Sequence, residues 1–177
     1  MDDLRKYYYA AGTAQGWNMP RIAPYHCGPY RLAIMLQDPG SPYTAGSGAQ
    51  VSREIGVRNN DPTAEFIGNA LAAVGMPENE VLLLNALPGF GMKPNKGCLT
   101  AGAAFNSQII RRAGVKSLLV CGRLAQRANL LLDLPAVNTV ATHHPSRRGH
   151  NHASPGGRGK WMKALKTSLE NLEMRRG

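Results

Sequence analysis

The sequence has few cysteines, and their number and spacing exclude several kinds of site. Cys27, Cys98 and Cys121 form no CxxC pair and give no disulfide framework. They also fall short of the thiolate set that an iron–sulfur cluster usually takes. This sparse use of cysteine favours a reduced, cytoplasmic protein. Long apolar runs are missing as well, since none approaches the length of a membrane span. We expect no secretory signal, because Asp2 and Asp3 stand where such a signal carries positive charge.

Acidic residues are scarce too: the chain has 11 Asp and Glu against 21 Lys and Arg, for a formal net charge of +10. From position 134 to 169 there is no Asp or Glu at all. This balance makes a polyanion the first partner to consider, although such a stretch can also be a solubilising basic face. The same stretch holds six basic residues and four of the five histidines, namely Arg147, Arg148, Arg158, Lys160, Lys163, Lys166, His143, His144, His150 and His152.

Length and composition predict one folded domain. The chain has 177 residues, of which 43% are hydrophobic, so it can bury a core without metal or disulfide staples. We expect a single domain over 1–177. Its first 30 residues are the least defined part, with a short helix at 4–11 and a loop after it.

From residue 32 onward, apolar runs alternate with helical patterns. The strand-like runs lie at 32–36, 81–84, 117–121 and 137–141. Helices are expected at 62–74, 100–112, 124–132 and 158–174, the first of them opened by Asp61-Pro62. Repeated strand–helix units predict an α/β fold, a three-layer α/β/α sandwich with a central four-stranded parallel sheet.

Polar side chains follow three of these runs where each strand ends. Asp38 follows the first run, Asn85 the second and His144 the last. Ligands of open parallel sheets bind outside the carboxyl ends of the strands. A carboxylate, an amide and an imidazole at this edge indicate an active site.

The motifs that contain these residues resemble the uracil-DNA glycosylase superfamily. The matching segments are Gln37-Asp38-Pro39-Gly40, Leu82-Leu83-Leu84-Asn85-Ala86 and His144-Pro145-Ser146, in that order. The segment 59–64 looks like a bacterial subgroup, and the missing cluster cysteines separate the chain from the iron–sulfur branches. The resemblance implies a DNA-repair hydrolase that cuts the N-glycosidic bond of uracil, or of other deaminated bases, with no cofactor and no metal.

The resemblance also implies a role for each motif residue. Asp38 matches the carboxylate that stabilises the sugar cation and orients or deprotonates water. His144 matches the residue that hydrogen-bonds the base oxygen O2 as a neutral imidazole. Asn85 matches the amide that reads N3–H and O4. The backbone around Gln37 is expected to donate to O2.

DNA is the implied partner, single- or double-stranded and containing uracil, and the target base must be flipped out. We expect a monomer with no membrane contact. The family often has a leucine wedge near the position of Arg148, which would fill the gap left by the base. The expected DNA-contacting residues are Ser41, Ser146, Arg147, Arg148, Arg158 and Lys160.

Two positions depart from the best-known branch. Gly40 stands where that branch has a tyrosine that shuts out the methyl group of thymine, so thymine exclusion is open. The aromatic residue that stacks on uracil is also open, with Tyr43 and Phe90 as the candidates.

Three alternatives compete with a glycosylase. One is a protein of the same fold that binds uracil-containing or damaged DNA but cleaves it poorly. A second is a metal site built from His143, His144, His150 and His152, which lack helical i,i+4 pairing and a nearby carboxylate. A third is a nucleotide-binding α/β protein, although no Walker A run or GxGxxG follows the first strand.

Overall fold

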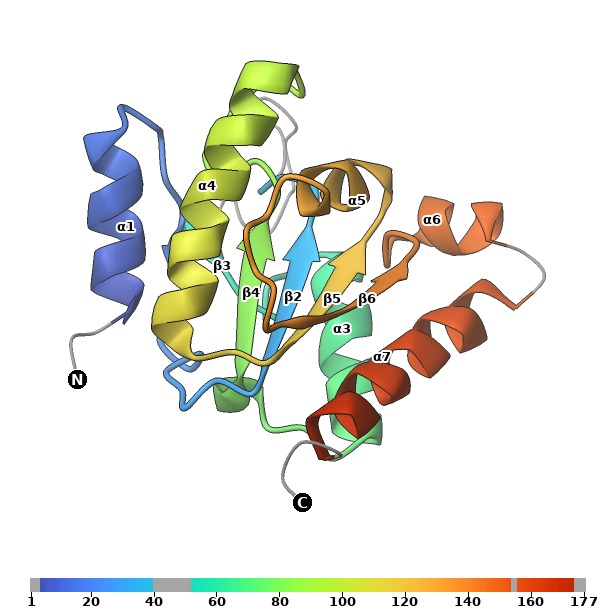
Figure 1. Ribbon diagram of the computed structural model, residues 1–177. Helices are drawn as coiled ribbons and strands as arrows, with labels where there is room; N and C mark the ends of the chain where they lie inside the picture. The colour runs from blue at the N-terminus through green and yellow to red at the C-terminus, as the bar shows by residue number, and fades with distance from the viewer. Residues whose placement is uncertain (1–3, 40–51, 154–155, 174–177) are drawn as a thin grey trace.

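Figure 1 shows the computed structural model, which describes residues 4–39, 52–153 and 156–173. At its centre four parallel strands form a sheet in the order β4–β2–β5–β6. Each strand begins within one residue of the apolar run that predicts it, so the parallel four-stranded sheet is confirmed. The strands are β2 Leu32–Leu36, β4 Val81–Asn85, β5 Ser117–Cys121 and β6 Asn138–Thr142.

Helices cover both faces of this sheet (Figure 1). The chain leaves β2 towards β4 and then returns across β2 to β5, and right-handed crossovers in opposite directions put their helices on opposite faces. One layer contains α4 and α5, and the other contains α3 and α7, where Phe66 of α3 meets Trp161 of α7 edge-on at 5.1 Å between ring centroids. The helices are α3 Pro62–Ala73, α4 Lys96–Ala113, α5 Arg123–Asn129 and α7 Gly157–Glu173.

The burial of the strands explains their composition. Strands β4 and β5 are buried along their whole length, as continuous apolar runs covered on both faces should be. Strand β6 lies at the sheet edge and is only partly buried, in an alternating pattern. Its sequence accordingly mixes asparagine and threonine with the apolar residues.

Local capping fixes where the helices begin and end. The Asp61 side chain accepts hydrogen bonds from two backbone N–H groups and caps α3 as predicted. Helix α4 begins earlier than the predicted residue 100, because Asn95 caps it by accepting from the Cys98 N–H at 2.9 Å. It ends at Gly114, whose φ of 69° is left-handed. Helix α5 ends at Asn129, three residues short of the predicted 132.

Several elements lack a signal in the sequence. A second sheet pairs β1 Arg21–Ile22 with β3 Glu54–Ile55 in parallel, and a short 3-10 helix, η1 Glu78–Glu80, precedes β4. Helix α6, Arg147–His152, has no apolar periodicity. Its N-cap is Ser146, whose hydroxyl accepts from the Gly149 N–H at 3.1 Å.

The N-terminal segment forms a helix, α1 Leu4–Ala14, that packs against the helical layer of α4. Tyr8 of α1 is fully buried and lies edge-on to Phe105 of α4, with ring centroids 5.3 Å apart. Burial raises the pKa of the Tyr8 phenol far above its usual value. None of the described helices is both long and apolar enough to cross a membrane.

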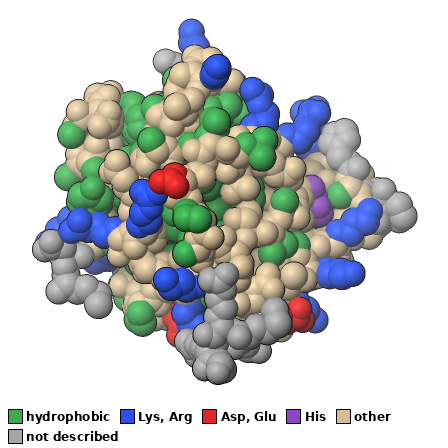
Figure 2. Space-filling view, in the orientation of Figure 1, with side chains coloured by type: hydrophobic (Ala, Val, Ile, Leu, Met, Phe, Trp, Pro, Cys, Tyr) green, Lys and Arg blue, Asp and Glu red, His purple; other side chains and the backbone are tan. Residues whose placement is uncertain are grey.

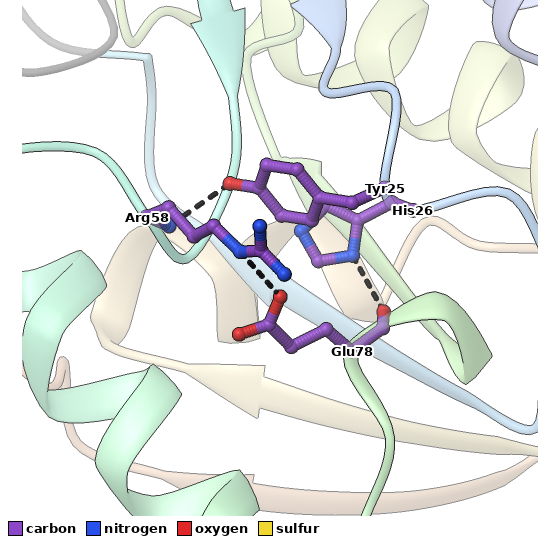
Figure 3. A network of polar contacts seen from close by, with 4 residues as sticks. All are labelled: Tyr25, His26, Arg58 and Glu78. Atoms are coloured by element: carbon purple, nitrogen blue, oxygen red, sulfur yellow. Dashed lines mark hydrogen bonds and ion pairs between the residues drawn. The ribbon is translucent and has the colours of Figure 1, made fainter.

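A polar network ties the N-terminal segment to the start of β4 (Figure 3). Tyr25 accepts from the Arg58 N–H at 2.9 Å, and Arg58 pairs with the Glu78 carboxylate at 2.8 Å. The buried His26 donates from Nδ1 to the Glu78 carbonyl oxygen at 2.7 Å, and burial lowers the pKa of His26. Glu78 precedes β4, so this network lies at the amino edge of the sheet and braces the fold away from the polar motifs.

Candidate functional site

The polar motifs lie at the carboxyl edge of the sheet, as expected. Strand register pairs Leu36 with Asn85 and Cys121 with Thr142. The segments that continue past β2, β5 and β6 therefore leave the sheet side by side. Strand β2 connects to β4 on one side and β5 connects to β6 on the other, so the crevice beyond β2 and β5 is where such folds bind ligands.

A cavity of about 690 Å³ opens at this edge. It brings together Gln37, His144, Ser146 and Arg148, four residues that the sequence singles out. Two arginines and no carboxylate are found in its described lining, so the cavity suits an anionic ligand. The lining residues are Gln37, Gly122, Arg123, Gln126, His143, His144, Ser146, Arg148, Gly149 and Ala153.

The absence of a side chain at Gly122 lets His144 pack closely against the turn after β5. Its φ of 91° is left-handed, and a Cβ added there would lie 3.0 Å from His144 Cβ and 3.6 Å from Gln37 Cδ. The Gly122 N–H and the Gln126 side-chain amide both donate to the Thr142 carbonyl oxygen, at 2.8 and 2.7 Å. The turn after β5 thus fixes the end of β6 just before His144.

The environment of His144 favours a neutral imidazole. Burial is the largest effect and lowers the pKa of His144, while the Asp38 carboxylate acts in the opposite direction. Asp61, the cap of α3, also raises this pKa. Asp38 itself is exposed at the surface. An exposed carboxylate therefore acts by charge on a half-buried imidazole.

The neighbouring histidine has a different partner. His143 Nε2 lies 2.9 Å from His150 Nδ1, and the His150 ring meets Phe66 edge-on at 4.3 Å between centroids. Burial lowers the pKa of both His143 and His150, and charge from Lys160 and Arg158 lowers them further. His143 is thus hydrogen-bonded to His150 of α6, whereas His144 packs against Gly122 in the turn after β5.

The metal alternative finds no support in the described part of the chain. No three histidine, cysteine or acidic side chains described there are arranged to hold a metal ion. His143 and His150 bond to each other instead. The His152 side chain lies outside the described residues.

The loop from His144 to Gly149 is tightly folded. A Cβ on Gly149 would lie 2.0 Å from the His144 carbonyl oxygen, so only glycine fits. Ser146 accepts the hydrogen bond that caps α6, and it lines the cavity. Arg148 is exposed beside it, and the Arg147 side chain lies outside the described residues.

Asn85 does not line the 690 Å³ cavity. Its side chain is only 2% exposed, and its Oδ1 has no hydrogen-bond partner among the described residues. Asn106 of α4, fully buried, donates from Nδ2 to the Asn85 carbonyl oxygen at 2.8 Å. Sequence reasoning missed Asn106, although an amide within the apolar spacing of a helix was a signal.

Phe90 is also outside this cavity. It is buried, and the Arg53 guanidinium lies over its ring at 4.7 Å. Its N–H donates to the Asn18 carbonyl oxygen at 2.8 Å, and Asn18 Oδ1 accepts from Arg53 Nη2 at 2.6 Å. A base that stacked on this face of Phe90 would have to displace the guanidinium.

The remaining predicted residues fall in two groups. Gly40, Ser41 and Tyr43 lie outside the described residues. Arg158 and Lys160 lie at the start of α7, where Arg158 and His150 line a second cavity of about 430 Å³. Lys160 Nζ donates to the Ala153 carbonyl oxygen at 3.0 Å, which brings α7 close to α6.

Two cavity residues were missed from the sequence, Arg123 and Gln126. They follow Gly122, the residue at which the third strand ends, so the rule that selected Asp38 and His144 applies here as well. A lone arginine after a glycine has no motif to mark it.

Comparisons with known proteins give a weak structural match. No family model matches the chain, and no curated protein matches it in sequence. Among solved structures, a match in fold is a tyrosine-to-phenylalanine variant of mimivirus UNG in complex with UGI. That match has a TM-score of 0.43 and 14% identity, and covers 72% of this chain and 54% of that chain. The chain therefore spans about half the length of the matched structure.

Proposed function

We propose that the protein is a uracil-DNA glycosylase of a bacterial-type branch without an iron–sulfur cluster. It would hydrolyse the N-glycosidic bond of uracil in DNA and leave an abasic site. The observation that carries this proposal is the convergence of Gln37, His144 and Ser146 on one cavity, with the Asp38 carboxylate acting on the imidazole.

The reaction needs stabilisation of two opposite charges. When the bond between C1′ and N1 breaks, its electron pair leaves with uracil and the sugar becomes a cation. Asp38 would face that cation and take a proton from the water that adds to C1′. His144 would donate from its neutral ring to O2, where negative charge grows. A lowered pKa of His144 supports this, because the neutral ring predominates at neutral pH.

Base choice would depend on Asn85. Its buried Oδ1, which has no described partner, is an acceptor that the N3–H of uracil can satisfy. The same amide can donate to O4. Cytosine has an acceptor at N3 and an amine at C4, so a fixed amide would meet it with like groups. Leaving such buried groups unpaired costs about 1–3 kcal/mol each.

A panel of oligonucleotides tests the proposal under single-turnover conditions, with excess protein. Each would carry one uracil, cytosine, thymine, hypoxanthine or xanthine, single-stranded or mispaired, and released base would be measured. Release of uracil with rejection of cytosine is the expected result. Binding without release would instead identify a damage-binding protein of the same fold.

A further inference from the structure

Asn106 is a fully buried amide on α4, and it contacts two strands near their ends. Its Nδ2 donates to the carbonyl oxygen of Asn85, the last residue of β4, at 2.8 Å. The same nitrogen lies 3.9 Å from the sulfur of Met35 in β2. The proposed base-reading amide therefore has a polar neighbour that the sequence motifs do not include.

The Asn85 carbonyl needs a partner from outside the sheet. Strand β4 is the outer strand of the described sheet, with β2 on one side only. The Ala86 N–H donates to the Leu36 carbonyl oxygen at 2.9 Å, on the β2 side. Across the same trans peptide, the Asn85 carbonyl points the opposite way, to the side without a described strand. A buried carbonyl has to be hydrogen-bonded, and Asn106 supplies the donor that a further strand would have supplied.

Helix α4 lies close enough to hold the segment after Asn85 from this side. Gly102 is one turn before Asn106 on the same face of the helix. A Cβ added to Gly102 would lie 2.3 Å from the Ala86 carbonyl oxygen and 3.1 Å from Pro88 Cδ, so the missing side chain permits the approach. The peptide after Asn85 is therefore held between β2 on one side and α4 on the other.

We propose that Asn106 is a positioning residue for base choice, because it fixes the Asn85 peptide and thereby the direction of the Asn85 amide. The direction of a side chain follows from the backbone that carries it, since the backbone bonds at Cα determine where Cβ lies. Without Asn106, this peptide at the outer edge would rotate towards another donor, and the amide would turn with it. The inference rests on the proposed function, in which the Asn85 amide distinguishes uracil from cytosine.

The next residue of α4 offers a matched control. Ser107 is also buried, and its hydroxyl accepts from the Asp133 N–H at 3.1 Å. Asn106→Ala and Ser107→Ala each remove one hydrogen bond between a buried side chain of this helix and the backbone of another segment. Both should lower the free energy of unfolding, measured by urea titration, but only Asn106→Ala should alter base choice. Neither changes a charge, so both keep the Lys and Arg side chains that Figure 2 shows over α5, α6 and the start of α7.

Base choice is measured as binding, with two single-stranded oligonucleotides that differ in one base. One carries 2′-fluoro-2′-deoxyuridine and the other 2′-fluoro-2′-deoxycytidine. Fluorine disfavours the sugar cation, so the bond to the base stays intact during the measurement. The preference is the Kd of the cytosine probe divided by the Kd of the uracil probe. Asn106→Ala should lower it by about fivefold or more, the loss for one misaligned buried hydrogen bond. Ser107→Ala should leave it unchanged.

Asn106→Asp tests whether the hydrogen bond itself is responsible. Aspartate has nearly the shape of asparagine, and burial raises the pKa of a carboxyl group. The protonated carboxyl can donate to the Asn85 carbonyl oxygen, whereas the ionised form cannot. At pH 5.5 this variant should therefore keep more of the preference than Asn106→Ala, and it should lose that advantage as its carboxyl ionises at higher pH. A preference at pH 5.5 as low as that of Asn106→Ala would assign the effect to packing and overturn the proposal. The pH comparison is made within one variant, against the wild type, so it does not depend on the stability of Asn106→Ala.

Each outcome decides one of the two proposals or both. An unchanged preference in Asn106→Ala, when the wild type prefers uracil, would overturn the role of Asn106 and leave the glycosylase intact. A lost preference in Asn106→Ala, with no release of unmodified uracil by the wild type, would support the positioning role and reject the glycosylase. Equal binding of both probes by the wild type would reject Asn85 as the base reader, and the role of Asn106 with it.

Discussion

Polar residues on the two sides of the carboxyl edge of the sheet differ in burial and in contacts. On the β6 side, His144 sits on a glycine turn and borders an open cavity. On the β4 side, Asn85 is buried and its backbone is held by Asn106. One strand-end rule predicts both residues. The contrast shows that the rule locates an edge, while the neighbouring elements decide which side chains meet solvent there.

The contrast has an energetic side as well. A buried acceptor without a donor costs about 1–3 kcal/mol, and the Oδ1 of Asn85 has no donor among the described residues. His144 does not carry this cost, because its half-buried ring borders the cavity.

The largest expected effect on uracil release comes from removing the carboxylate of Asp38. Asp38→Asn should slow single-turnover uracil release by about a hundredfold or more, because the cation and the attacking water lose their carboxylate. DNA affinity should change little. Asp133→Asn, which removes an exposed carboxylate paired with Arg111, is the control. Unaltered release by Asp38→Asn would remove Asp38 from the mechanism.

The second prediction concerns the β6 side and compares the roles of two adjacent histidines. His144→Ala should slow release by on the order of a hundredfold, the usual loss for one oxyanion donor. His143→Ala should have a smaller effect, since its ring bonds to His150. A reversal of the two effects would show that the assignment is shifted by one residue.

The pH profile gives the same comparison a second measurement. The pKa of His144 is lowered from 6.5, so the neutral ring predominates at neutral pH and is protonated only as pH falls through this lowered pKa. The wild-type rate should therefore decline on the acid side. His144→Ala should lack that part of the decline. An identical acid limb in both proteins would assign it to another group.

The third prediction concerns the β4 side. Asn85→Leu should slow uracil release by about 5- to 150-fold, since one or more buried groups of the base lose their partner. Its free energy of unfolding, from urea titration, should hold or rise, because the amide oxygen that is removed has no described partner. Asn85→Asp should also lose uracil activity, with at most a trace on cytosine. A stability loss with full activity would make Asn85 purely structural.

Much of this arrangement was accessible from the sequence. Buried parallel strands require continuous apolar runs, so the four strands and their polar ends could be predicted. Asp61-Pro62 and Gly114 marked helix ends because capping is local chemistry. His144 and Ser146 were selected by motif order, and the structure places both at one cavity.

The remainder depends on contacts between distant segments. Helix α6 is short and polar, and it is held by the Ser146 cap and the His143–His150 bond, neither of which is periodic. Asn106 bonds a residue 21 positions away. Arg123 borders the cavity only because α5 and α6 lie around the same space. No local sequence pattern predicts these contacts between distant segments.

The fourth prediction tests how far the basic surface extends beyond α6. Arg158→Gln with Lys160→Gln should lower the salt slope by about 0.7 for each phosphate contact that is lost, and weaken binding to all sequences alike. The measurement is Kd, at several salt concentrations, of a single-stranded oligonucleotide with one tetrahydrofuran abasic site, which cannot be cleaved. Lys163→Gln with Lys166→Gln, further along α7, is the control pair. An unchanged slope in the first pair would mean that the DNA does not contact the start of α7.

The smallest expected effect is on the free energy of unfolding in acid. The histidine pair on the β6 side should contribute to its fall. Burial lowers the pKa of His26, His143, His144 and His150 in the folded protein. Below about 6.5 the unfolded chain therefore binds more protons than the folded one, and the free energy of unfolding should fall as pH falls. His150→Phe keeps an aromatic ring against Phe66 but removes one titrating group and its bond to His143. Urea unfolding at pH 7.5 and 5.5 should show a smaller acid loss in this variant than in the wild type. The His26 network at the opposite edge should keep its share of the loss in both proteins. An equal loss in the two would mean that the imidazole pair on the β6 side does not contribute to acid unfolding.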